Sequence, residues 1–172
     1  VVHPFEGPGD YPTLGRNLTS QGLYGPTMAE TLSLVCKAGH NPKGELEGEV
    51  ISKLKSNYFY TFNRLLWLQD EVLIADDNQK SLLDAEDLSK LEMLLRGRLK
   101  QGDPSVRSVP YGFETGSQFA SDLEKNKWMI GLAGKEGAEK LAYVANKYNS
   151  KLFLYVPDKF EFPTARVAGL SS

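Results

Sequence analysis

The stretch that decides the fold reads Trp128-Met129-Ile130-Gly131-Leu132-Ala133-Gly134-Lys135-Glu136-Gly137. Its apolar start is typical of a buried strand, and the glycines that follow are typical of a turn into a helix. A helical pattern then runs to residue 148, with Ala138, Leu141, Ala142 and Ala145 on one face. We therefore expect a strand, a glycine turn, a helix and then a second strand over residues 152–156.

Short apolar segments and helical ones also alternate on both sides of this stretch. A strand is expected at 106–109, a short helix from Thr115 or Ser117 carrying Phe119 and Leu123, and a last strand around 166–167. Strands separated by helices favour parallel pairing with right-handed crossovers. The second half of the chain is therefore expected to contain a βαβ unit.

The first half of the chain is expected to be mainly helical. Thr27-Met28-Ala29-Glu30 matches a capping box, which predicts a helix start. A second helix is expected from about Glu45, with the aromatic residues 58–62 continuing its spacing. Apolar runs at 65–68 and 72–75 around a short polar turn predict a β-hairpin. A further helix is expected to start near Ser81 or Asp84, with the leucines at 88–99 on one face.

These segments predict an α/β or α+β fold. We expect a mixed sheet of about four to six strands, a helical amino-terminal part and a carboxyl-terminal βαβ unit. Residues 1–26 are rich in proline and glycine, so they are expected to form an extended arm packed on the domain or on a partner. Residues 27–172 are expected to form a single globular domain, since a chain of 172 residues with 41% hydrophobic content can bury one core.

Charge and cysteine content exclude several classes of protein. The net charge of −2 lacks the basic excess of a general nucleic-acid binder, so nucleic acid is an unlikely partner. The sequence holds no apolar run long enough for a bilayer, so we expect a soluble protein with no membrane partner. The single cysteine, Cys36, forms no intramolecular disulfide, which fits a cytoplasmic location.

The glycine turn and the loop after residue 109 supply the candidate ligand-binding residues. Free amides at a strand-to-helix turn favour anions, and glycines let a phosphate approach the backbone. The candidates are Tyr111, Gly112, Gly131, Gly134, Lys135 and Gly137. The spacing Gly-x-x-Gly-x-x-Gly differs from the standard dinucleotide and P-loop patterns. The alternative is that these glycines serve only tight turning and close packing.

The remaining reactive residues give no catalytic or metal site. Asp70, Glu71, Asp76 and Asp77 flank the predicted hairpin, where they are more typical of turns and caps than of magnesium ligands. His40 and Cys36 lack the spacing of a zinc site. We therefore assign no catalytic residue, no metal ligand and no cofactor.

The sequence leaves the function unknown and supports two hypotheses. The favoured one is a non-catalytic binding or assembly protein, which contacts a protein partner or its own copy through residues 1–26. The alternative is a small-molecule or phosphate-binding α/β domain, with or without enzymatic activity, whose site lies around Gly112 and Gly131–Gly137. The first is favoured because the chain lacks a recognisable set of acid, base and nucleophile.

Overall fold

The computed structural model describes residues 9–56, 59–76, 87–148, 151–154 and 163–170. The elements are α1 (Tyr11–Ser20), α2 (Met28–His40), α3 (Glu45–Ser56), β1 (Phe59–Trp67), β2 (Glu71–Asp76), α4 (Leu88–Lys100), β3 (Val106–Pro110), β4 (Gly116–Phe119), α5 (Ala120–Leu123), α6 (Lys127–Tyr148), β5 (Lys151–Leu154) and β6 (Thr164–Leu170).

The strands form a four-stranded sheet in the order β3-β2-β1-β6 and a two-stranded sheet of β4 and β5. Helices with a sheet of this size confirm the predicted α+β class. Every strand pair in the described part of the chain is antiparallel. The expected parallel strands with crossovers are therefore wrong, and β4 and β5 instead pair antiparallel across α5 and α6.

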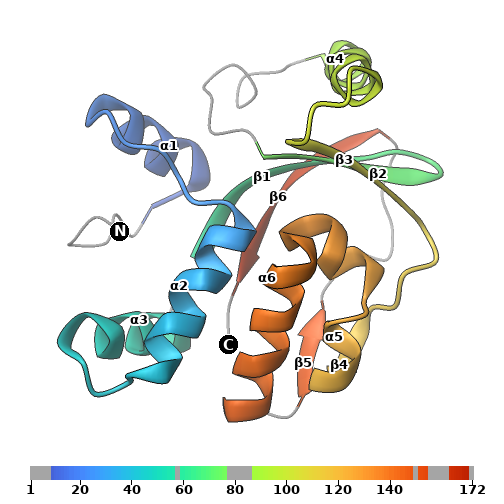
Figure 1. Ribbon diagram of the computed structural model, residues 1–172. Helices are drawn as coiled ribbons and strands as arrows, with labels where there is room; N and C mark the ends of the chain where they lie inside the picture. Colours follow the sequence, from blue (N-terminus) through green and yellow to red (C-terminus); the bar gives the residue numbers. More distant parts are fainter. Residues whose placement is uncertain (1–8, 57–58, 77–86, 149–150, 155–162, 171–172) are drawn as a thin grey trace.

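Helices cover both faces of the larger sheet (Figure 1). α2 and α6 lie on one face, while α4 and α1 lie on the other. Alternate residues of β1 and β2 serve the two layers: Leu65 and Ile74 pack with α2 and α6, whereas Leu66 and Leu73 pack with α4. Among the described helices, none is long and apolar enough to cross a bilayer.

Two local predictions from the first half of the chain are confirmed. α2 begins at the predicted capping box: the Thr27 amide donates to Glu30 at 2.7 Å, and the Glu30 amide donates to the Thr27 hydroxyl at 3.3 Å. The hairpin pairs Leu66 with Leu73 and Trp67 with Val72. The leucine-rich helix is α4, which begins at Leu88 and is capped by the Asp87 side chain. The start expected near Ser81 or Asp84 falls on residues outside the described part.

Residues 59–62 belong to β1, which fixes the end of the second helix, a point that the sequence pattern left open. α3 ends at Ser56, and β1 runs from Phe59 to Trp67. Its outer neighbour β6 pairs Phe59 with Leu170. The aromatic spacing that resembled a helix therefore belongs to a strand with one irregularity in its register, between Tyr60 and Arg64.

The amino-terminal segment contains a helix where we expected an irregular arm. α1 spans Tyr11–Ser20, with Asp10 accepting the Thr13 amide at 2.8 Å as its cap. Pro12 lies in the first turn, where the missing amide costs nothing, so its presence does not prevent a helix. The Tyr11 ring lies 4.9 Å from Phe62 and 5.6 Å from Tyr60, which packs α1 on β1. The division of the chain at residue 26 stays a prediction, and residues 1–8 lie outside the described part.

The strand expected at residues 128–130 is the start of α6. The Asn126 side chain caps this helix by accepting the amides of Trp128 and Met129 at 3.0 and 3.2 Å. Gly134 interrupts the helix with φ 72° and ψ 170°. We call residues 127–133 the first half of α6 and residues 135–148 the second half. The helix expected from Thr115 or Ser117 begins later, because residues 116–119 form β4 and α5 follows.

Candidate functional site

Gly131 lies inside the first half of α6 rather than at a strand end. A Cβ atom built on it would overlap Cγ2 of Val109, so the missing side chain lets α6 approach β3. Its carbonyl oxygen accepts a hydrogen bond from Arg107 Nε at 2.6 Å. The predicted anion position is therefore taken by the Gly131 carbonyl oxygen, which already binds the cationic side chain of Arg107.

Arg107 connects this helix end to the sheet. Its two terminal nitrogens each donate at 2.6 Å to the Asp76 carboxylate. The Asn63 side-chain Nδ2 donates to the Asp76 carboxylate at 2.5 Å. The Asn63 Oδ1 accepts the Met28 backbone amide, at the start of α2, at 2.6 Å. This chain of polar contacts ties α2, β1, β2, β3 and α6 together, which is a structural role.

The other glycines of the predicted turn also have roles within the fold. Gly134 carries the positive φ that separates the two halves of α6. A Cβ on Gly137 would lie 2.6 Å from Cβ of Ala133, in the contact between α6 and α2. Lys135 is 82% exposed and lies 3.9 Å from Glu139. The first turn of the second half also holds Glu136, whose pKa is lowered by its bond to Lys140, so negative charge already occupies the helix start.

Tyr111 and Gly112 form the bend that follows β3. The Tyr111 hydroxyl donates to the Leu68 carbonyl at 2.6 Å, and its ring stacks on Trp67 with centroids 6.2 Å apart. Burial, followed by the nearby charge of Asp70, raises the pKa of Tyr111. Gly112 provides a φ of 94°. Both residues fasten this loop to the hairpin, and a ligand-binding role for the six predicted residues stays a prediction.

Two of the carboxylates around the hairpin, Glu71 and Asp76, are held by basic or hydroxyl partners, while Asp70 is exposed in the turn. Asp76 pairs with Arg107, and Glu71 pairs with Arg96 at 2.6 Å. Burial disfavours the charged form of Glu71 and raises its pKa. The hydrogen bonds from Ser108 and Arg96 outweigh burial, so the pKa of Glu71 is lowered. Asp77 lies outside the described residues, and the described part contains no group of three or more side chains placed to hold a metal ion.

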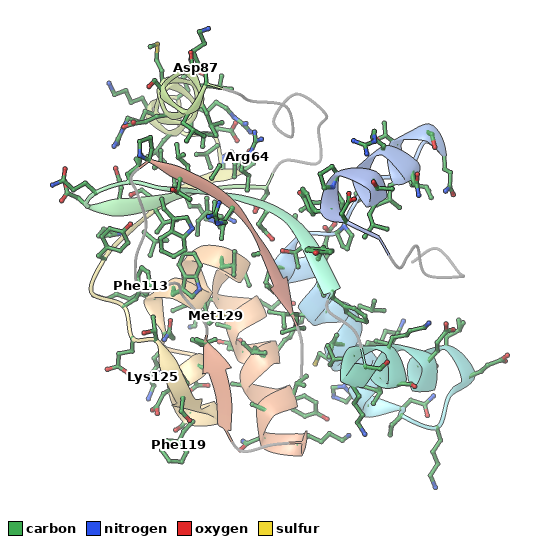
Figure 2. The ribbon with its side chains drawn as sticks, turned by 180° about the vertical axis from the view of Figure 1, so that it is seen from behind. Arg64, Asp87, Phe113, Phe119, Lys125 and Met129 are labelled. Atoms are coloured by element: carbon green, nitrogen blue, oxygen red, sulfur yellow. The ribbon has the colours of Figure 1, made fainter. Side chains whose placement is uncertain are left out.

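An open groove of about 500 Å³ lies between α5 and the second half of α6. It is lined by Phe119, Ala120, Ser121, Glu124, Glu139, Ala142, Tyr143 and Asn146. Phe119 is 52% exposed and Tyr143 is 38% exposed. Figure 2 shows Phe119 at the edge of the molecule, beyond the ribbon of β4 and α5. The groove therefore combines an apolar floor with two aromatic side chains that water reaches.

Neighbouring residues hold the Tyr143 ring in place. The His40 ring stacks on it with centroids 4.5 Å apart and an angle of 7° between the planes. His40 is itself fixed, because its Nδ1 lies 2.8 Å from the Cys36 carbonyl oxygen. His40 is the last residue of α2, and its imidazole contacts the Cys36 carbonyl oxygen of the preceding turn. An aromatic side chain fixed in this way loses little freedom on binding.

The groove carries negative charge. Glu124 and Glu139 are both exposed, and the described residues that line the groove include no lysine, arginine or histidine. Lys135 approaches Glu139 from outside the groove. Its Nζ lies 3.9 Å from the Glu139 carboxylate and its side chain is 82% exposed, so the ion pair is loose. The arrangement therefore suits aromatic contact with a ligand that is neutral or cationic.

Sequence reasoning missed this groove. It placed Phe119 in a short helix, whereas Phe119 ends β4. A signal was present for Tyr143, since it lies off the face formed by Ala138, Leu141 and Ala145 in a helix that is otherwise correctly predicted. An aromatic residue on the polar face of a helix is a candidate for binding.

The described arrangement of helices and strands resembles the fold of one solved structure. The chain is similar to a solved structure described by the words "Accommodation of massive sequence variation in Nanoarchaeota by the C-type lectin fold", with a TM-score of 0.61 and 16% sequence identity. The match covers 91% of this chain and 82% of that chain. No family model and no curated protein matches the sequence. At 16% identity this likeness concerns the fold alone.

Proposed function

We propose that this chain is a non-catalytic binding protein that holds a segment of a partner protein in the groove between α5 and α6. The observation that carries the proposal is the pair of exposed aromatic residues, Phe119 and Tyr143, that line that groove. Aromatic residues are enriched among the side chains that dominate protein–protein affinity. The groove volume of about 500 Å³ is enough for a few side chains of a partner.

The fold supports the same proposal. The structural neighbour is described as a C-type lectin fold that accommodates massive sequence variation. A scaffold of that kind keeps its core while surface side chains differ. Recognition in the α5–α6 groove would likewise rest on side chains, namely Phe119, Glu124, Glu139 and Tyr143, above a buried layer that includes Ala120 and Ala142.

A display selection with random peptides on the wild-type protein tests the proposal. Selected peptides are expected to bind the Phe119→Ala/Tyr143→Ala variant at least about tenfold more weakly, because the aromatic contacts are lost. Tyr24→Ala is the matched control, since Tyr24 is 64% exposed and does not line the groove. Equal binding to the wild type and the double variant would contradict the proposal.

Phe119→Ala alone guards against a loss of folding. Tyr143 stacks on His40, so its removal also weakens the contact between α2 and α6, whereas the Phe119 side chain is largely exposed. Circular dichroism melting of each variant identifies any loss of structure. A folded Phe119→Ala variant that keeps full affinity for the selected peptides counts against the groove.

The two roles predicted for other parts of the chain remain separate proposals. Self-association through residues 1–26 is tested by light scattering before and after removal of that segment. A phosphate site around Gly112 and Gly131–Gly137 has less support, because Arg107 and Glu136 already occupy the two helix ends at Gly134.

A further inference from the structure

We infer that the partner group held in the α5–α6 groove is a cation, the side chain of a lysine or an arginine. This inference rests on the proposed function and names the chemistry that the groove selects. Its starting point is the presence of two carboxylates, Glu124 and Glu139, in the lining of one groove. Glu124 follows α5 and Glu139 lies in the second half of α6, so the two come from different elements.

Charge excludes one class of ligand. The described lining residues comprise carboxylate, hydroxyl, amide, aromatic and alanine side chains, without a basic group. An anionic ligand would lose part of its water shell here and meet the like charges of Glu124 and Glu139. A cation meets opposite charges from two elements of the groove lining.

The aromatic residues favour the same ligand. A guanidinium or ammonium group over the face of an aromatic ring is attracted by the ring's negative face, and arginine also stacks on it. The Tyr143 ring is stacked on His40 and has Lys147 Nζ 5.8 Å from its centroid, so an incoming cation would compete with Lys147 at that ring. Phe119 and Tyr143 can also cover the aliphatic stem of a lysine or arginine, while the carboxylates bind its charged end.

The loose contact of Lys135 with Glu139 is consistent with an exchangeable cation. Lys135 Nζ lies 3.9 Å from Glu139, with the two side chains 82% and 51% exposed. By contrast, Glu136 on the same helix binds Lys140 at 2.5 Å. Glu139, the carboxylate inside the groove, is therefore held more weakly than Glu136. An incoming basic side chain would have to displace only the loose contact with Lys135.

The test titrates the labelled protein with three small probes and follows backbone amide signals by nuclear magnetic resonance. The probes are N-acetyl-arginine amide, N-acetyl-glutamine amide and methyl glucoside. N-acetyl-arginine amide is expected to shift signals of residues 119–124 and 139–146. It should bind at least about fivefold more tightly than the glutamine probe, and added salt should reduce the difference.

The variants Glu124→Gln/Glu139→Gln and Glu136→Gln supply the matched comparison. The first pair should remove the preference for arginine over glutamine, because both groove carboxylates are lost. Glu136→Gln should preserve that preference, since Glu136 is 80% exposed and lies outside the groove lining.

The outcomes separate this inference from the proposed function. If the glutamine probe or methyl glucoside binds the groove as tightly as the arginine probe, the cation inference fails and a binding groove remains. If selected peptides need Phe119 but are not enriched in lysine or arginine, the inference fails in the same way. If peptides bind independently of Phe119 and Tyr143, both ideas fail.

Discussion

At the scale of single residues, Arg107 and Asp76 provide the sharpest stability prediction. Their side chains are 28% and 26% exposed and form two bonds of 2.6 Å. Arg107→Ala leaves the Asp76 charge and the Gly131 carbonyl without this donor, so the free energy of unfolding should fall by about 2 kcal/mol. Urea unfolding measures the loss.

A double-mutant cycle tests whether that loss comes from the pair. Asp76→Ala in the Arg107→Ala background should cost less than Asp76→Ala alone, by about 1 kcal/mol or more. Arg166→Ala is the control, because Arg166 is exposed on β6 and its change should stay within about 0.5 kcal/mol. Strict additivity of the two single changes would show that the pair contributes nothing.

Tyr11 should make the folded protein less stable at alkaline pH. Burial against β1 raises the pKa of Tyr11 to about 12, with the Arg64 charge opposing the shift. An unfolded tyrosine titrates near a pKa of about 10, so between about pH 10 and 12 the unfolded chain loses this proton first. The stabilising contribution is therefore complete below about pH 10 and is lost as the pH rises through 12.

Tyr11→Phe isolates that effect. Between about pH 9 and about pH 11.5, wild type should lose up to about 1 kcal/mol more unfolding free energy than Tyr11→Phe, after allowance for solvent screening. Tyr24→Phe serves as the control, since Tyr24 is 64% exposed. Parallel pH profiles for wild type and Tyr11→Phe would refute a buried phenol at this position.

At the scale of elements, the close approach of α6 to β3 depends on Gly131. Gly131→Ala places a methyl group against Val109, whose branched side chain has few alternative rotamers, so stability should fall by about 1–3 kcal/mol. Gly97→Ala in α4 is the matched change, because nothing lies within 4 Å of a Cβ there, and it should stabilise by up to about 1 kcal/mol.

Val109→Ala checks the cause of the Gly131 effect. In that background Gly131→Ala should cost less than in wild type, since the overlapping methyl group has been removed. The same cost in both backgrounds would place the strain elsewhere. Thermal unfolding of the four proteins is sufficient for the comparison.

Elements with a local chemical signature were predictable from sequence. The capping box at Thr27 and Glu30 and the hairpin around residues 68–71 depend on neighbours in the chain, and both are confirmed. The strand predicted at residues 128–130 was wrong because a short apolar run fits a strand and a buried helix equally well. The deciding residue is Asn126, whose side chain caps α6 through the amides of Trp128 and Met129.

At the scale of the whole molecule, the groove was beyond sequence reasoning. Its aromatic residues, Phe119 and Tyr143, come from β4 and α6, and their relation depends on how α5 packs on α6. The sequence presented the glycines as the conspicuous feature. Packing instead uses Gly131 and Gly137 for contacts within the core, so the most recognisable residues serve the fold.

The layers of the molecule differ in how firmly they are held. The core contacts of β1 and β2 on both faces join α2, α4 and α6 to one sheet. α1 is different: Gly15 is its buried residue, and Tyr11 packs on Tyr60 and Phe62. We therefore expect α1 to open separately from the rest, since few apolar contacts must break.

Native-state hydrogen exchange tests this expectation. Amides of α1 should exchange at least about tenfold faster than those of α2, whose buried residues include Leu32 and Val35. Tyr11→Ala should accelerate exchange in α1 and leave the β1–β2 hairpin unchanged, because the removed ring joins only α1 to the sheet face. Equal protection of α1 and α2, or a loss of protection across the whole sheet in Tyr11→Ala, would show that α1 unfolds together with the core and is no separable arm.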